Sequence, residues 1–172
     1  GPSAPRLLED VYSLADAVVF GSLMMSLLRH ARRVTSASLA QMVNVIAPIM
    51  TEPGGPAWRQ TTFYPFAITS RLAQGVALDL TVDAGTYETA RHGEVPLVDI
   101  AATHDAQTAS AAVFLVNRSV SDPVTVAVDV SALGGVTVRE SHVLADDDVY
   151  AKNTLDHPTR VTPKPAEGIV VE

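Results

Sequence analysis

The chain has 172 residues, of which 47% are hydrophobic and 18% are charged, and its formal net charge is −7. The apolar content is enough for a packed core and argues against disorder, while the acidic balance, without any run of Lys and Arg, argues against nucleic-acid binding. Cysteine is absent, which excludes disulfides, thiolate metal sites and a cysteine nucleophile. No secretion signal is visible, so a cytoplasmic location is expected.

The first predicted element is a helix that begins after Ser13. Ser13 is a suitable N-cap, and Asp16 three residues later makes a variant capping box. Apolar residues continue at helical spacing and also fill much of the remaining surface, so the helix is expected to be covered on several sides. The apolar stretch 15–28 is too short to cross a membrane, which takes roughly 20 residues. A basic segment, 29–33, suits the end of this helix.

Residues 34–40 are predicted to form a short strand between helical segments, as in a βα unit. Residues 41–63 follow as a long connection rich in Pro and Gly, and loops of this length without regular structure usually carry function. Pro65 is predicted at the first position of a second helix that runs to about Ala73, with Gly75 just past its end. These elements cannot cover their own apolar surface, so we expect an exposed apolar face unless a partner copy covers it.

Beyond Gly75 the hydrophobic period changes to two. Alternation predicts half-buried strands over 76–82, 124–130 and 136–139. Residues 111–116 are apolar throughout, which predicts a strand covered on both faces. With turn signals between the runs, this pattern indicates an antiparallel sandwich.

The change of character near Gly75 divides the chain into two parts. Residues 1–74 form an α/β part that looks like the end of a larger array, and residues 75–172 form an all-β domain.

Two stretches carry a family resemblance. Residues 40–52 (AQMVNVIAPIMTE) and 54–66 (GGPAWRQTTFYPF) resemble the last barrel strand and the following loop of glycoside hydrolase family 51 α-L-arabinofuranosidases. The preceding LLEDVYSLADAVVFGSLMMSLLRHARRV is similar to that family's helix before the last strand. Residues 114–119 (FLVNRS) and 142–144 (HVL) resemble its C-terminal sandwich. The implied fold is the tail of a (β/α)8 TIM barrel in 1–74 followed by a jelly-roll-like antiparallel sandwich, mainly β.

The resemblance also implies an activity for a parent enzyme. That enzyme would be a retaining exo-hydrolase that removes terminal non-reducing arabinofuranosyl units from arabinan or arabinoxylan, with two carboxylates roughly 5 Å apart. In the family the acid/base follows an Asn, and the nucleophile lies in an Asp-Glu-Trp-like motif. Neither an Asn-Glu nor a Glu-Trp dipeptide occurs here. We therefore expect no catalytic residue in this chain, both glutamates upstream of Gly1, and no activity of the chain alone. No cofactor is expected, and the resemblance points to a multimeric parent, so a homo-oligomer stays open.

Three residues are candidate substrate contacts. Gln41 lies just past the end of the implied barrel strand, where barrel enzymes place their sites, and the resemblance implies a glutamine near here that touches arabinose. Its neutral amide can donate to and accept from sugar hydroxyls, or it can satisfy loop backbone instead. Asn44 is the second candidate, against local turn bonding. Trp58, the only tryptophan, could stack on a sugar or anchor the loop to the barrel.

The remaining polar clusters offer little chemistry. The histidines have no metal-ligand spacing, so no metal site is expected. The acidic run 146–148 lacks the spacing of a Ca²⁺ loop and is interpreted as a solvated turn.

The alternative to an enzyme fragment is a non-catalytic carbohydrate-binding sandwich module. Such modules present aromatic platforms, whereas aromatics total only 5% here. A third role, in which the sandwich braces the barrel, is compatible with the first.

Overall fold

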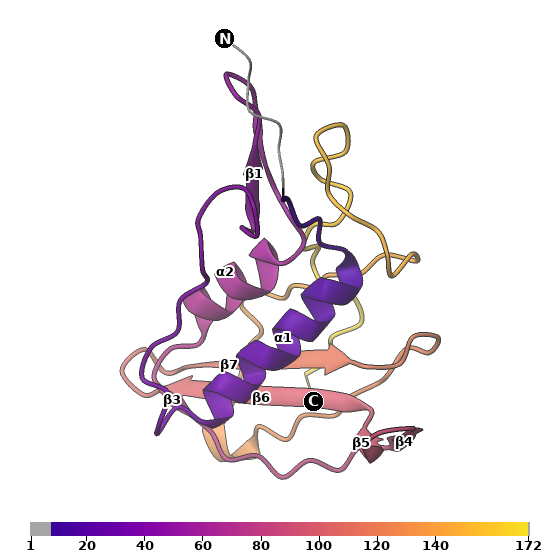
Figure 1. Cartoon of the computed structure of the whole chain (residues 1–172). Coiled ribbons are helices and arrows are strands. Elements are labelled where there is room, and N and C mark those ends of the chain that lie inside the picture. The colour runs from indigo at the N-terminus through magenta and orange to yellow at the C-terminus, as the bar shows by residue number, and fades with distance from the viewer. Residues whose placement is uncertain (1–7, 172) are drawn as a thin grey trace.

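The computed structural model describes residues 8–171; the ends of both predicted domains, residues 1–7 and 172, lie outside the described residues. Within that range the chain forms two α-helices, one short 3-10 helix and three small antiparallel sheets (Figure 1). The elements are α1 (Leu14–Arg29), β1 (Ile49–Thr51), β2 (Ala57–Arg59), α2 (Phe63–Leu72), β3 (Val76–Ala77), β4 (Thr86–Thr89), β5 (Gly93–Pro96), β6 (Val98–Asp105), β7 (Ser110–Asn117) and η1 (Ser131–Leu133).

The predicted start of α1 is confirmed. The Ser13 backbone N–H donates to Asp16 Oδ2 at 2.7 Å, and the Asp16 N–H donates to Ser13 Oγ at 3.4 Å, which completes the capping box. The next two free N–H groups, those of Leu14 and Ala15, donate to carbonyls in the segment 149–151 at 2.8 Å each. A distant segment therefore satisfies donors that the first turn leaves open.

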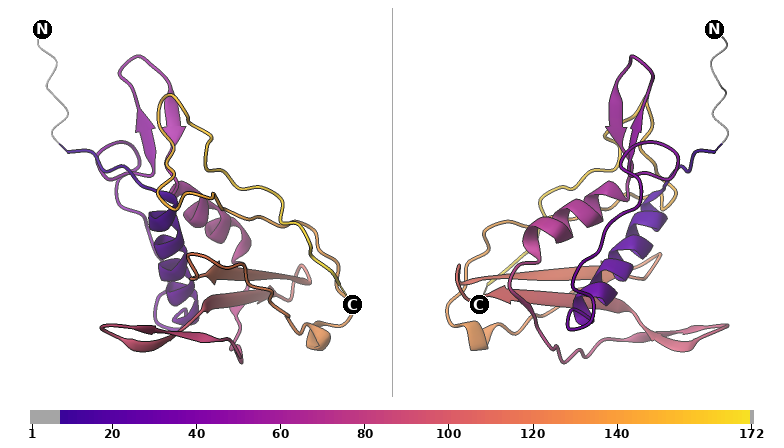
Figure 2. Two further views of the ribbon diagram at one scale, coloured as in Figure 1. Left: turned by 90° about the vertical axis from the view of Figure 1, so that its right-hand side faces the viewer. Right: turned by 60° about the vertical axis from the view of Figure 1, so that its left-hand side comes forward.

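Helix α1 packs across a sheet in which β6 lies between β3 and β7 (Figures 1 and 2). Met25 packs with Ala101 of β6 and Val116 of β7 in one buried cluster. A second cluster, at the start of the helix, consists of Leu14, Ala151 and Val161. Helix α2 lies beside α1 on the same side of the sheet, and the hairpin β1–β2 projects away from it.

The predicted strand at 34–40 is wrong. These residues have no regular structure and are mostly exposed. A strand of a parallel barrel sheet needs partners on both edges, and no segment among residues 8–171 pairs with this one. The predicted featureless connection over 41–63 is also wrong, because β1 and β2 pair there as an antiparallel hairpin.

The second helix is confirmed with a shifted start. It begins at Phe63, so Pro65 occupies its third position, where a missing N–H still leaves no helical bond broken. Gly75 follows the helix with φ of 79°, and a Cβ there would collide with the His104 carbonyl. This close approach to β6 explains the glycine.

The strand predictions beyond Gly75 hold only in part. The strand around 111–116 is confirmed as β7, but exposed side chains alternate with buried or partly buried ones, so coverage on both faces is wrong. The strand expected over 76–82 is reduced to β3, and 124–130 and 136–139 are not strands. Alternation alone does not make a strand without a paired neighbour: in 124–130, Val126 and Val128 are exposed, and Val124 and Val130 are half-buried.

The chain exposes much more surface than a compact protein of its size. Its accessible area is 12112 Å², whereas a compact monomer of 18.2 kDa exposes about 8,100 Å². The predicted exposed apolar face is present on α1, where Val19 is 61% and Leu23 is 56% exposed. Among the described residues, neither helix is long and apolar enough to span a membrane.

Candidate functional site

The three candidate residues lie on the loop before β1 and on the hairpin β1–β2. Gln41 is exposed, and its Oε1 is 3.5 Å from the Ile46 N–H, a long contact that leaves the amide available. Trp58 lies in the middle of β2, half-buried, and pairs with Met50 across the hairpin. The loop and the hairpin thus bring these residues to one end of the molecule, away from the main sheet (Figure 2).

Asn44 differs from Gln41 because both ends of its amide are engaged. Its Oδ1 accepts the Thr51 N–H at 2.8 Å, and its Nδ2 donates to Thr51 Oγ1 at 2.9 Å. This is the local turn bonding that competes with a substrate role. Asn44 lies three residues after Gln41 in the same loop, but its amide is hydrogen-bonded to Thr51 of β1.

A buried amide that sequence reasoning missed holds this loop to the helices. Gln60 is 1% exposed, and its Oε1 accepts the Tyr12 N–H at 2.9 Å. Its Nε2 donates to the carbonyls of Asp10 at 3.1 Å and Ala47 at 2.9 Å. One side chain therefore joins the entry to α1, the candidate loop and the end of the hairpin.

Asn153 is a second buried amide, and it joins the end of β2 to the C-terminal segment. It is 1% exposed and donates from Nδ2 to the Arg59 carbonyl at 3.0 Å and to the Val161 carbonyl at 2.9 Å, while its Oδ1 accepts the Val161 N–H at 2.8 Å. These bonds close the loop 154–160 and place it beside the hairpin (Figure 2).

Two of the surface hollows lie along the segment 143–164, and neither is lined by the three candidate residues. One, of about 440 Å³, is lined by residues 156–160. The other, of about 360 Å³, lies beside Asp146, Asp147 and Lys164. The candidates form an open surface in this chain rather than the wall of either hollow.

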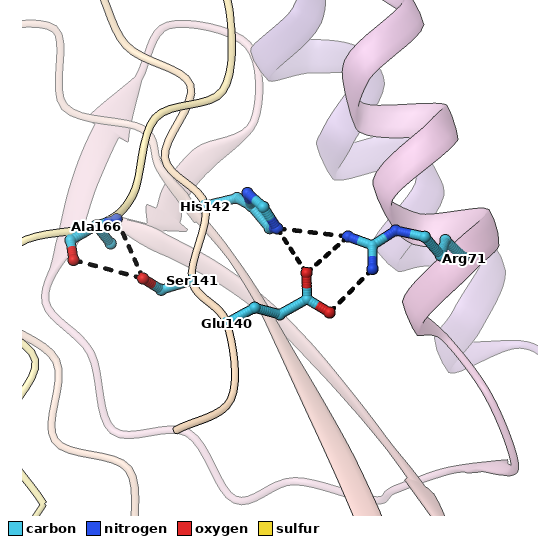
Figure 3. A network of polar contacts seen from close by, with 5 residues as sticks. All are labelled: Arg71, Glu140, Ser141, His142 and Ala166. Atoms are coloured by element: carbon cyan, nitrogen blue, oxygen red, sulfur yellow. Dashed lines mark hydrogen bonds and ion pairs between the residues drawn. The ribbon is translucent and has the colours of Figure 1, made fainter. Parts of the chain in front are cut away.

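A charged cluster joins α2 to the segment 140–142 (Figure 3). Arg71 donates to both carboxylate oxygens of Glu140 at 2.9 and 2.8 Å, and His142 Nε2 lies 2.8 Å from Glu140 Oε2. The neighbouring Ser141 turns away and bonds the backbone of Ala166. Hydrogen bonds from Arg71, and then from His142, lower the pKa of Glu140 to about 2. This carboxylate is therefore charged at neutral pH and unsuited to general acid catalysis.

The Glu140 cluster predicts how stability changes in acid. The carboxyl has a pKa of 4.5 when unperturbed and about 2 in the fold, so its contribution is complete above pH 4.5 and is lost as the pH falls toward 2. Glu140→Gln should flatten the dependence of the thermal midpoint on pH in that window, measured by circular dichroism. Arg71→Leu should flatten it similarly, because Arg71 is the main cause of the shift. Unchanged slopes in both variants would show that the cluster does not stabilise the fold.

The pKa values of three other carboxyl groups are also lowered by the fold. Among residues 8–171 the displaced carboxyl pKa values, those of Asp105, Asp129, Glu140 and Asp146, are all lowered. A catalytic acid needs a raised pKa, so none of these four has the electrostatics of one. In the acidic run 146–148, Asp146 and Asp148 face Arg160 at 3.3 and 3.4 Å. The described residues contain no group of three or more acidic or histidine ligands placed to hold a metal ion.

The most buried charged side chain among residues 8–171 is structural. Asp99 on β6 is 6% exposed, with Arg29 of α1 at 2.6 Å from one carboxylate oxygen and Arg118 at 2.8 Å from the other. Arg29 also donates to the Ile100 carbonyl, and Arg118 to the Pro96 carbonyl. The carboxylate thus binds the end of α1 to the sheet.

By its fold the chain is mixed α and β, with α1 packed on a three-stranded antiparallel sheet and α2 packed against α1, and its candidate site is a loop that presents a neutral amide. The family model described as the α-L-arabinofuranosidase C-terminal domain matches residues 2–172. The chain therefore belongs to the family of α-L-arabinofuranosidase C-terminal domains.

Curated relatives agree with this assignment. The chain is 56% identical over 167 residues to an intracellular exo-α-(1→5)-L-arabinofuranosidase of Streptomyces lividans, covering 97% of this chain and 25% of that protein. It is 53% identical to an exo-α-(1→6)-L-arabinofuranosidase of Bifidobacterium longum, covering 95% of this chain and 31% of the relative. A solved family 51 α-L-arabinofuranosidase from Bifidobacterium longum superposes with a TM-score of 0.89 at 48% identity, covering 95% of this chain and 32% of that structure. The chain thus spans a quarter to a third of these relatives.

Proposed function

We propose that this chain is the C-terminal part of an intracellular, retaining exo-α-L-arabinofuranosidase. The enzyme removes terminal non-reducing arabinofuranosyl units from arabinan or arabinoxylan, and both catalytic carboxylates come from the remaining length that the relatives have. The two relatives' names differ in linkage, so the proposal is confined to the arabinofuranosyl unit and assigns no linkage. The observation that carries it is the family match over residues 2–172.

The exposed surface supports the view that the chain works as one part of a larger enzyme. The chain exposes Val19 and Leu23 on α1, together with the unpaired segments 34–40 and 124–130. We infer that residues 1–74 are the tail of a (β/α)8 barrel whose remaining length covers the exposed helix face, and that residues 75–172 form a jelly-roll-like sandwich.

Gln41 is the proposed substrate contact within this chain. It is exposed, its amide makes only a long contact with Ile46, and a neutral amide can bind sugar hydroxyls without competing for the catalytic proton. Trp58 is the second proposed contact, in which the half-buried indole ring stacks on a sugar ring of the substrate.

The test is hydrolysis of 4-nitrophenyl α-L-arabinofuranoside. The purified 172-residue chain should show no turnover above buffer. A chimera in which it replaces the matching quarter of the Streptomyces lividans relative should hydrolyse the glycoside. An inactive chimera that folds would contradict the proposed enzyme. Turnover by the chain alone that follows the purified protein would contradict the assignment of the carboxylates elsewhere. Arabinan binding by the inactive chain alone would favour a binding module instead.

A further inference from the structure

The loop that carries Gln41 has an unusual backbone. Gln41, Asn44 and Val45 have φ values of 55°, 61° and 61°, in the left-handed region that L side chains disfavour. For a β-branched residue such as Val45 this conformation is a clear outlier. Strained backbone of this kind persists only where the surroundings fix it, and it gathers at ligand sites.

The surroundings fix this loop at successive carbonyls. The Asp10 N–H donates to the Val45 carbonyl at 2.7 Å, and the Tyr12 hydroxyl donates to the Ile46 carbonyl at 2.9 Å. The buried amide of Gln60 holds the next carbonyl along. These contacts restrain residues 45–47 of the loop but do not involve the residues between Gln41 and Val45.

Asn44 supplies the restraint for that half. Its backbone N–H donates to the Ile49 carbonyl at 2.8 Å, and its side chain binds both the N–H and the hydroxyl of Thr51. Asparagine tolerates a left-handed φ, and its amide offers one acceptor and one donor to match the two groups of Thr51. Asn44 therefore ties the strained turn directly to β1.

We propose that Asn44 is a positioning residue that holds Gln41 in the orientation in which its amide meets an arabinofuranosyl hydroxyl. This inference rests on the proposed function and assigns Asn44 a role different from a direct sugar contact. The Asn44 amide acts through the backbone that joins it to Gln41, and Thr51 anchors it.

Two substitutions separate the amide from the backbone. Both variants are made in the chimera with the Streptomyces lividans relative. Asn44→Gly removes the side-chain bonds to Thr51 but keeps a residue suited to a positive φ. Asn44→Ala removes the same bonds and also places at this position a residue that disfavours a positive φ. Because misplaced binding groups lose contact with the substrate, both variants should raise the KM for 4-nitrophenyl α-L-arabinofuranoside about tenfold, with a smaller change in kcat. Asn117→Ala, which removes another asparagine with local bonds at 117–122, should leave KM unchanged.

A double substitution tests whether Asn44 acts through Gln41. If it does, Asn44→Ala should raise KM little further once Gln41→Ala is present. Additive effects would contradict the positioning role, as would full activity of Asn44→Gly. A change in thermal midpoint without a change in KM would assign Asn44 to stability alone. An inactive unsubstituted chimera would contradict the proposed function, and the inference with it.

Hydrogen exchange on the unfused 172-residue chain gives a readout that does not need catalysis. In Asn44→Ala and Asn44→Gly the amides of Thr51 and Ile46 should exchange faster, while those of β6 and β7 keep their protection. Unchanged exchange at Thr51 would overturn the inference, because the Thr51 N–H is the group that Asn44 holds.

Discussion

Replacing Gln60 by leucine is expected to lower the free energy of unfolding by about 3 kcal/mol, because three backbone groups, one buried and two partly buried, lose their hydrogen bonds, and a buried polar group left without a partner costs about 1–3 kcal/mol. These partners are the Tyr12 N–H and the carbonyls of Asp10 and Ala47. Leucine has nearly the same volume, so the loss reports unsatisfied polar groups rather than a cavity. Urea unfolding, followed by circular dichroism and by the fluorescence of Trp58, measures it.

The control is Gln74, an exposed glutamine at the end of α2 that bonds only nearby carbonyls in the helix. Gln74→Leu should change the free energy of unfolding by less than about 0.5 kcal/mol. If Gln60→Leu is equally mild, Gln60 does not hold the loop. A loss confined to the Trp58 signal would mean that the hairpin opens separately from the rest of the chain.

The elements that could be predicted from the sequence are those specified by local signals. The capping box of Ser13 and Asp16 marks the start of α1, and the glycine after α2 marks its end. The apolar run at 111–116 correctly predicts β7. The capping box depends on residues three positions apart, and β7 pairs with β6, the strand just before it in the chain, whereas Gly75 also answers a longer-range demand, the close approach of its backbone to His104.

The errors concern segments whose structure depends on distant partners. Residues 34–40 and 124–130 have the composition of strands, but without a paired edge they remain irregular. The opposite error concerns β6, which was not predicted because Asp99 and His104 interrupt its apolar pattern. Two arginines from elsewhere in the chain neutralise Asp99 and make the strand compatible with burial.

The candidate site shows the same limit at the level of single side chains. Gln41 is the first predicted contact and Asn44 the second, since local turn bonding accounts for an asparagine, and the fold adds that Gln41 is exposed while the partner of the Asn44 amide is Thr51. Neither Gln60 nor Asn153 is predicted to be buried, because a polar residue is normally expected at the surface. Their most distant partners lie 48 to 50 and 94 residues away, at Tyr12, Asp10 and Arg59, and no local pattern encodes such pairs.

Asp99→Ala is expected to lower the free energy of unfolding by about 3 kcal/mol, the low end for breaking a buried ion pair. The low end applies because the side chains of Arg29 and Arg118 are 40% and 28% exposed, so water can solvate part of their charge once the carboxylate is gone. The two guanidinium groups would then face each other without a counter-charge, at the point where α1 meets the sheet. Urea unfolding of the variant measures the loss, and the exposed Asp79→Ala should change it by less than about 0.5 kcal/mol.

A double-mutant cycle separates the ion pair from the rest of the substitution. Arg29→Leu removes one of the two cations, so Asp99→Ala should be less damaging in that background, with a coupling of about 1–2 kcal/mol. Zero coupling would mean that the carboxylate stabilises β6 without joining it to α1. Strong coupling would mean that the Asp99–Arg29 pair itself stabilises the contact between α1 and the sheet, where the same carboxylate also holds Arg118 just after β7. The candidate loop is in turn joined to the start of that helix through Gln60, so loss of the carboxylate would be transmitted to the loop through α1.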